Sequence, residues 1–458
     1  MMHASPSMSG ICPRIGLLEH FGGGNLGDDA TVTAVMQNIR RRWPNSIICG
    51  LSMNPADTQA RHGITAYPIR QKTWAMSRSM SAESTRNSLK YQFKTFLHGY
   101  PLVYGALSTL NYFAIRLPRT IAQEVVFVIK SFRVVRSLDI VIISGGGQLL
   151  DSWGGPWAFP YTILKWVLLA KAAHRKCYFL NVGAGPLSHR LSRWFVRLAL
   201  CRAEYVSFRD ANSRSLTYNI GFRGSSQAVA DCVYSYELPP RPFAPRSPQV
   251  GCVVGLSPMA FRDPQVYWEK NLGDYQSLTQ KLIQFGTWLN MHDYVVKLFS
   301  TDISFDAATL TTIASNLCDH TAPSRVDLVP VTDISSLFET LTEIQYLITC
   351  RFHGVIFAHL FNIPVIALSH HPKISVLMQD IGLSEYNLDI STFTVDHLIE
   401  VFIRLQRNSH YIRQNMRQTA QRFNSRLVAQ FDTLFPPPIQ RLPTSRQVHD
   451  FASNPCYF

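Results

Sequence analysis

TCRFHGVIFAHLFNIPVIALSHHPK, residues 349–373, is the stretch that decides the fold. The apolar residues just before Arg351, at 344–350, predict a buried strand, and the run at 365–369 predicts a second strand. Between them, the apolar spacing after His353 and Gly354 predicts a helix. A strand, a helix and a further strand in this order are typical of a parallel α/β sheet, and they place Arg351 and His353 where the first strand ends.

The same alternation of apolar runs and helical spacing extends in both directions from this stretch. Further strands are predicted at 14–20, 47–51, 139–144, 177–182, 205–208, 251–256, 294–299 and 326–329. Five prolines within 238–249 predict a hinge. We therefore predict two Rossmann-like domains that face across a cleft, at 1–237 and 250–435, followed by a flexible tail at 436–458. A long polar helix is predicted at about 395–432.

The composition narrows the class of binding partner and the cellular compartment that we expect. The 458 residues carry a net charge of +14, which predicts an anionic partner. The nine cysteines form no C-x-x-C pair and favour buried, reduced thiols. We find no signal peptide and no uninterrupted apolar stretch of about 18 residues. These features predict a cytoplasmic protein, with peripheral attachment at the inner face of a membrane as the further expectation.

The segment 60–136 is predicted to be a basic helical insertion in the first domain. From Arg61 to Arg136 it holds twelve lysines and arginines, two acids and many aromatic residues. This composition is typical of a helix on an anionic membrane surface, and it would equally hold an anionic acceptor. An ordinary solvated insertion has the same composition. Nucleic acid is not expected, because no nucleic-acid-binding motif accompanies the charge.

Glycines and charged residues gather at the predicted strand ends. The glycine-rich ends contain Gly24, Asn25 and Asp28, and Gly145, Gly146 and Gly147; the charged ends contain Arg209, Asp231, Arg351 and His353. In an open α/β sheet these ends are where ligands bind. Arginine binds carboxylates and phosphates, and histidine near a helix N-terminus serves as an acid or a base. Tight turns and a helix-capping ion pair are the structural alternatives.

Taken in order, these motifs resemble one enzyme family. The ordered set is Gly24-Asn25-Leu26-Gly27-Asp28, Ser144-Gly-Gly-Gly147, Arg209-Asp210, Asp231, and Arg351-Phe-His353-Gly354 with Pro364 and Lys373. It resembles the polysaccharide pyruvyl transferase family over roughly 14–55 and 137–385. The long insertion, the tail beyond 436 and Cys350, where a small hydroxyl residue is expected, depart from the family pattern.

The resemblance implies a fold similar to the GT-B glycosyltransferases and transfer of a pyruvyl group from phosphoenolpyruvate. The product is a ketal on a sugar of a polysaccharide or lipid-linked oligosaccharide of the cell envelope, and phosphate is released. Such chemistry needs an acid, a base and cations for the departing phosphate, and it implies neither a metal nor another cofactor. A glycosyltransferase that uses a nucleotide sugar and a non-enzymatic scaffold are the alternatives.

The resemblance also implies roles for particular residues. Arg209 and Arg351 bind the two anionic groups of the donor, and Lys373 adds a cation. His353 protonates the methylene carbon or assists phosphate departure, whereas Asp28 is the base for the sugar hydroxyl. Gly24, Asn25 and the glycines at 145–147 shape the cleft, and Gly354 allows close approach.

Overall fold

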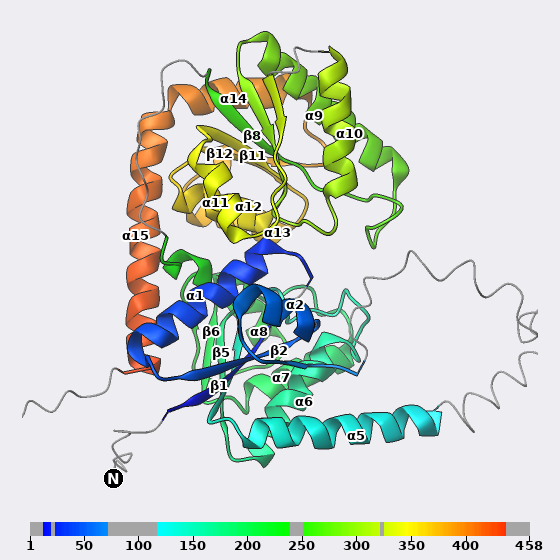
Figure 1. The fold of residues 1–458 in the computed structure, drawn as a ribbon, viewed down its shortest axis with the longest axis vertical. Coiled ribbons are helices and arrows are strands. Elements are labelled where there is room, and N and C mark those ends of the chain that lie inside the picture. Colours follow the sequence, from blue (N-terminus) through cyan, green and yellow to red (C-terminus); the bar gives the residue numbers. More distant parts are fainter. Residues whose placement is uncertain (1–11, 20–22, 72–116, 239–250, 321–324, 437–458) are drawn as a thin grey trace, which may run out of the picture.

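The computed structural model describes residues 12–19, 23–71, 117–238, 251–320 and 325–436. Two parallel β-sheets, each with helices packed on it, lie one above the other in Figure 1. The predicted fold class, two Rossmann-like α/β domains, is confirmed. The predicted hinge at 238–249 and tail at 436–458 lie almost wholly outside the described residues, as does the centre of the predicted insertion.

The first sheet has seven strands in the order β3-β2-β1-β4-β5-β6-β7. Its strands are β1 Arg14–Leu18, β2 Ile47–Ser52, β3 Ala66–Pro68, β4 Ile140–Ser144, β5 Lys176–Val182, β6 Tyr205–Phe208 and β7 Gln227–Ala228. Its helices are α1 Leu26–Arg42, α2 Pro55–His62, α5 Leu117–Arg136, α6 Phe159–Ala172, α7 Arg190–Leu200, α8 Ala211–Asn219 and the 3₁₀ helix η2 Cys232–Ser235. The order reverses between β1 and β4, which is where such sheets bind ligands.

The second sheet repeats this arrangement with six strands in the order β10-β9-β8-β11-β12-β13. Its strands are β8 Val253–Ser257, β9 Val295–Leu298, β10 Val326–Leu328, β11 Tyr346–Thr349, β12 Val365–Ser369 and β13 Asn387–Asp389. Its helices are α9 Leu272–Met291, α10 Ala307–His320, α11 Ile334–Thr342, α12 Phe352–Leu360, α13 Pro372–Asp380, η4 Ser384–Tyr386, α14 Val395–Arg407 and α15 Ser409–Leu434. Here the order reverses between β8 and β11.

The central strands form because they are apolar on both faces. All five residues of β4, β8 and β12 are buried, as parallel strands covered by helices on both sides require. The opening stretch therefore folds as predicted: β11 pairs with β12 in parallel, and α12 connects them. Its polar residues come to lie at the edge of the second sheet that faces the first domain.

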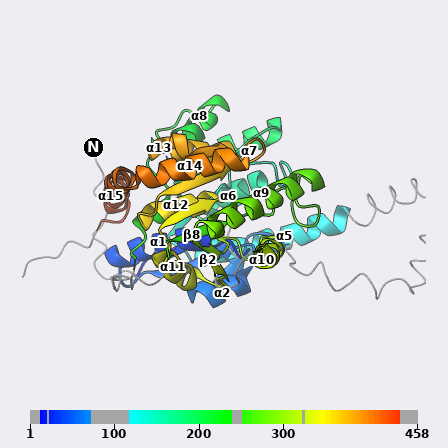
Figure 2. The same ribbon diagram turned by 90° about the horizontal axis from the view of Figure 1, so that it is seen from above.

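The predicted helix at 395–432 is two helices, because the chain breaks at Asn408. The amide of Asn408 donates to the hydroxyl of Tyr386 at 3.1 Å. Beyond the break, α15 runs along one side of the molecule from the second domain to the first (Figure 1), and Figure 2 shows it end-on. Its last turns are held by an ion pair between Asp432 and Arg42 and by Phe431 in the core beneath the first sheet.

The second domain predicted at 250–435 therefore supplies part of the first domain's core. Gln430, near the end of α15, exchanges hydrogen bonds with Asn181 in the first domain at 3.0 and 2.9 Å. The buried hydroxyl of Ser207 also accepts from Gln430. Such a buried and hydrogen-bonded network fixes how the end of α15 is seated.

The described part of the predicted insertion includes the helix α5. It packs on α6, where Lys165 and Glu124 pair at 2.8 Å. Among the described helices, none has the length and the apolar character that a membrane crossing requires.

Candidate active site

The glycine-rich end of β1 joins the two domains. The backbone N–H of Leu26 donates to the carbonyl of Thr301 at 2.9 Å, and that of Ile303 donates to the carbonyl of Gly24 at 3.1 Å. Gly24 has a positive φ of 78°, and a side chain there would clash with Ser304. Glycine at position 24 is therefore required by the close approach of the loop after β9.

The next residues of the motif build the start of α1 against the second domain. The side chain of Asn25 caps the helix by accepting from the backbone N–H of Gly27 at 3.0 Å. A methyl group on Gly27 would overlap the imidazole of His353. Because position 27 is glycine, a ring from the second domain lies against the first turn of α1, directly beside Asp28.

The glycines after β4 are not equivalent. Gly145 and Gly146 have positive φ values of 54° and 56°, so the chain turns back sharply where the strand ends. A side chain at Gly145 would also clash with Thr31 of α1. Gly147 meets no such restriction, since its nearest neighbour would be Leu150 at 3.8 Å.

Arg209 follows β6 and is nearly buried, yet it is weakly paired. Its guanidinium lies 3.8 Å from a carboxylate oxygen of Asp231 and 3.5 Å from one of Asp210, beyond good hydrogen-bond distance. Only 6% of its side chain is exposed, and its Nε has no hydrogen-bond partner among the described residues. The guanidinium lies 4.4 Å above the ring of Phe352, from the second domain.

Lys373 reaches the same ring from the start of α13. Its Nζ lies 5.7 Å from the centre of Phe352. Burial, and next the nearby Arg209, lower the pKa of Lys373 to about 8. The same causes hold the pKa of His353 well below its usual value, with Lys373 contributing to the repulsion. Arg209, Lys373 and His353 thus form one group of repelling cationic or protonatable side chains, which we call the cation cluster.

Arg351 is paired differently. Its guanidinium donates two hydrogen bonds to Asp306, at 2.9 and 2.5 Å, and lies 3.2 Å from Asp302. Both carboxylates are buried, and Asp306 is fully so. The nearby charges of Asp306 and Asp302 raise the pKa of Arg351 despite its burial. Its positive charge is therefore compensated within the protein by two carboxylates.

Buried acids of the first domain lie close to the cation cluster. Burial, and next the charge of Asp29, raise the pKa of Asp28 to about 8. Burial also raises the pKa of Asp231 and, more strongly, that of Glu19, which receives a long 3.4 Å hydrogen bond from Ser144. At neutral pH this region therefore holds a protonated carboxyl, Asp28, near an unprotonated imidazole, His353.

A comparison with protein families decides the identity. The model of the polysaccharide pyruvyl transferase family matches residues 25–372, which is most of the chain. The chain belongs to this family. It is accordingly an enzyme, a transferase. Among curated proteins, none matches the chain.

Solved structures support the fold of this pyruvyl transferase. A putative UDP-N-acetylglucosamine 2-epimerase from Listeria monocytogenes is similar, with a TM-score of 0.54, 10% identity, and coverage of 91% of this chain and 94% of the other. The UDP-GlcNAc 2-epimerase from Neisseria meningitidis is similar with a TM-score of 0.52 and 10% identity, over 92% of this chain and 99% of the other. A glycosyltransferase from Rickettsia africae is similar with a TM-score of 0.51 and 10% identity, over 94% of this chain and 99% of the other. At these identities the likeness concerns the fold alone, and it agrees with the predicted GT-B-like architecture.

The structure of the transferase brings most predicted site residues to the junction of the two domains. Asp28, Arg209, His353 and Lys373 lie near one another there, and Gly24 and Asn25 join the domains beside them. A side chain at Gly354 would clash with Thr349 at the end of β11, so this glycine lets α12 pack on its own strand. Its predicted role in the close approach of a ligand stays a prediction.

Sequence reasoning missed three acids of the site. Glu19 directly follows β1, and Asp302 and Asp306 follow β9 in the stretch Ser300-Thr-Asp-Ile-Ser-Phe-Asp306. Their position after apolar strands was a usable signal. Within the described part of the chain, no group of three or more acidic, histidine or cysteine side chains is arranged to hold a metal ion.

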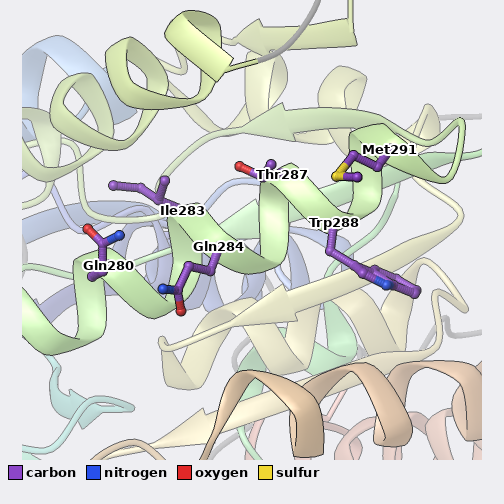
Figure 3. Close-up of a pocket in the computed structure, with 6 residues that line it drawn as sticks. All are labelled: Gln280, Ile283, Gln284, Thr287, Trp288 and Met291. Carbon is purple, nitrogen blue, oxygen red and sulfur yellow. The ribbon is translucent and has the colours of Figure 1, made fainter.

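A shallow depression on α9 is unrelated to the site. It has a volume of about 300 Å³, and all the residues that line it come from one face of α9 (Figure 3). They are Gln280, Ile283, Gln284, Thr287, Trp288 and Met291. Because none of these side chains is charged, this depression lacks the groups that an anionic donor requires.

Proposed function

We propose that the transferase moves the pyruvyl group of phosphoenolpyruvate onto two hydroxyls of a saccharide, forming a ketal and releasing phosphate. The observation that carries this proposal is the cation cluster. Arg209 comes from the first domain, while Lys373 and His353 come from the second. Burial, and next their mutual repulsion, disfavour the charged forms of the lysine and the histidine. An anion bound among them would relieve that repulsion.

Phosphoenolpyruvate suits this cluster because it carries a carboxylate and a phosphate. The weakly paired guanidinium of Arg209 is able to donate two parallel hydrogen bonds to one of these groups. Lys373 and the N-terminus of α13, where it lies, favour the other negative group. We do not assign the donor to Arg351, because Asp302 and Asp306 already occupy its guanidinium.

The pKa shifts favour the reverse of the acid and base roles implied by the family resemblance. In the first step, protonated Asp28 gives its proton to the methylene carbon of the donor. One sugar hydroxyl attacks the neighbouring carbon, and its proton goes to Nε2 of His353. Nε2 is buried and has no hydrogen-bond partner among the described residues, so it is available to accept that proton.

The second step restores both residues. The imidazolium of His353 gives its proton to the departing phosphate as the carbon–oxygen bond of the phosphate ester breaks. The second sugar hydroxyl attacks the same carbon and closes the ketal, and its proton goes to the carboxylate of Asp28. Two hydroxyl protons are thus consumed, one in the new methyl group and one on phosphate.

The test is the release of phosphate from phosphoenolpyruvate in the presence of a panel of p-nitrophenyl glycosides. Mass spectrometry of the glycosides then detects the ketal. His353→Ala and Asp28→Asn are each expected to lower kcat by about 10²–10⁴-fold, the usual loss when a general acid or base is removed. A folded His353→Ala enzyme with near-normal turnover would overturn its role.

The same assay separates the alternative function. If phosphoenolpyruvate yields neither phosphate nor ketal, while a nucleotide sugar raises the Tm of the protein, the enzyme is a glycosyltransferase. The fold is compatible with both activities, so the donor decides between them.

We also propose peripheral contact with an anionic membrane surface, at the cytoplasmic face where lipid-linked saccharides are built. Its support is α5, whose residues Ile121, Val125 and Ile129 recur every four positions and are each about half exposed. Arg119 and Lys130 on the same helix are exposed as well. An apolar row flanked by basic residues is typical of helices that lie in a membrane interface.

Co-sedimentation with vesicles that contain anionic lipid tests this contact at low salt. Replacing Ile121, Val125 and Ile129 together by serine is expected to release the protein from the vesicles. The matched control replaces Leu272 and Met291 on α9, which are equally or more exposed. Equal binding by both variants would exclude α5 as the contact.

A further inference from the structure

An aromatic corner spans the two domains. Trp153 lies on the loop after β4 in the first domain, and Trp268 lies on the loop between β8 and α9 in the second. Their ring centres are 5.9 Å apart, and the ring planes meet at 68°. One face of Trp268 stacks on Tyr267, with ring centres 3.9 Å apart.

Trp268 nonetheless remains 54% exposed, whereas Tyr267 beneath it is buried. A large apolar ring held in this way, and left half open to solvent, is a common feature of binding sites. Trp153 is only half-buried and packs against Phe159 at 6.4 Å. The two indoles therefore form a corner at the domain junction, and the exposed part of Trp268 is the surface that a ligand would contact.

The loop that carries Trp268 is fixed at several points. The backbone N–H of Ala260 donates to Asp306 at 3.0 Å, and Asp306 is also the principal partner of Arg351. Farther along the loop, the N–H of Asn271 donates to the carbonyl of Arg262 at 2.9 Å. The ion pair of Arg351 thus supports the loop of the aromatic corner, which gives this arginine a positioning role.

Three strand ends, one in the first sheet and two in the second, carry buried polar atoms without partners. Oε1 of Gln148 follows β4, Oγ of Ser257 ends β8 and Nδ1 of His370 follows β12. None of the three has a hydrogen-bond partner among the described residues. Buried polar atoms usually find partners, so each of the three is a candidate partner for a hydroxyl group of a ligand. The ring of His370 lies 6.2 Å from that of Phe261, which contacts Tyr267.

We propose that the aromatic corner of Trp153 and Trp268 is the acceptor subsite, where a pyranose ring of the saccharide stacks on the indole of Trp268. A pyranose has an apolar C–H face that suits an aromatic ring and a rim of hydroxyls that suits the unpartnered atoms. His370 links the corner to the cation cluster, because its ring lies near that of Phe261 and it stands three residues before Lys373 in the chain. The proposal rests on the proposed function, since it names the place of its second substrate.

A printed array of defined hexose and N-acetylhexosamine oligosaccharides tests this subsite with the full-length protein. Wild type is expected to bind a subset of the array, and Trp268→Ala is expected to bind the same spots roughly tenfold or more weakly. Trp194→Ala is the matched control, because Trp194 on α7 is also 54% exposed and lies outside the corner. Its binding is expected to equal that of wild type.

Donor binding is measured in parallel, so that a failure of the acceptor subsite can be told apart from a failure of the proposed function. Trp268→Ala is expected to keep the rise in Tm that phosphoenolpyruvate gives to wild type. If Trp268→Ala binds every saccharide as wild type does, or if wild type binds no saccharide, the acceptor subsite is overturned while the donor result stands. If phosphoenolpyruvate gives wild type no rise in Tm, the proposed function is what fails.

Discussion

Arg209 and Arg351 follow β6 and β11 in the same way, at the carboxyl end of a buried parallel strand, yet their surroundings differ. Arg351 forms two hydrogen bonds with Asp306 and lies 3.2 Å from Asp302. Arg209 approaches Asp210 and Asp231 only at 3.5 and 3.8 Å, and it has Lys373 as a cationic neighbour.

The difference separates structural support from ligand binding. The charge of a guanidinium that pairs with two buried carboxylates is neutralised, and these ion pairs stabilise the segments around it. A guanidinium that is buried beside other cations has an unmet need for negative charge. We therefore propose that one pattern in the sequence serves two functions, and that the acids supplied by distant segments decide which one applies.

The largest effect is expected from Arg351→Gln, which tests the structural side of the comparison. Removing the guanidinium leaves Asp302 and Asp306 buried without their cation. The free energy of unfolding should fall by about 3–5 kcal/mol, as measured by urea denaturation. The double variant Arg351→Gln/Asp306→Asn should recover part of this loss. Stability equal to wild type in Arg351→Gln would mean that the ion pairs contribute nothing.

Arg209→Gln tests the ligand-binding side of the comparison. We expect the affinity for phosphoenolpyruvate to fall by about 3 kcal/mol, or roughly 150-fold in Kd, because hydrogen bonds between two ionised groups are lost. Isothermal titration calorimetry measures this change. The free energy of unfolding should fall less than in Arg351→Gln, since the contacts of Arg209 to its neighbouring acids are long. If Arg209→Gln is the less stable of the two variants, the comparison is wrong.

The pH dependence of donor binding sharpens the comparison further. Lys373, with a pKa of about 8, loses its charge as the pH rises through 8. Asp28 becomes negative in the same range, because its pKa is also about 8. Both changes weaken the binding of an anionic donor. The Kd for phosphoenolpyruvate should therefore rise by about tenfold per pH unit or more above pH 8.

Lys373→Met should bind the donor more weakly than wild type at pH 7 and show a shallower rise of Kd with pH. In Lys373→Met/Asp28→Asn the rise should be nearly absent. A Kd of the wild-type enzyme that stays constant between pH 7 and 9.5 would contradict the cation cluster.

The smallest effect is expected at the cap that joins the domains. Asn25→Ala removes the hydrogen bond to the N–H of Gly27 and should cost about 1 kcal/mol of stability. The matched control is Asn271→Ala, which removes the corresponding cap of α9. Only Asn25→Ala should also weaken donor binding, because α1 begins beside His353. Equal donor affinity in the two variants would mean that the cap acts on stability alone.

Much of the fold was predictable, because the core strands are uniformly apolar and the turns after them are marked by glycine or by a charge. The break at Asn408 was not, since helical spacing continues on both sides of it and a contact with Tyr386 accompanies the break. The return of α15 to the first domain was equally hidden. Gln430 appears as one more polar residue of a polar helix until its partner Asn181 is known.

The grouping of the candidate site residues was easier to predict than their surroundings. Position at strand ends predicted that Asp28, Arg209 and His353 lie close together, because parallel sheets bring such ends together. The difference between Arg209 and Arg351 could not be foreseen, since Asp302 and Asp306 come from a segment about 50 residues before Arg351. The direction of proton transfer that we propose could not be foreseen either, because it rests on burial, which raises the pKa of Asp28 and lowers that of His353.

The most direct test of the central claim is a thermal shift with phosphoenolpyruvate on wild type and Arg209→Gln, beside inorganic phosphate and a nucleotide-sugar panel. At a ligand concentration of 100 Kd, binding should add about 2.7 kcal/mol to the stability of wild type. We predict a rise in Tm that is specific to phosphoenolpyruvate and that Arg209→Gln loses. A full rise in Arg209→Gln, or a response of wild type only to a nucleotide sugar, would contradict it.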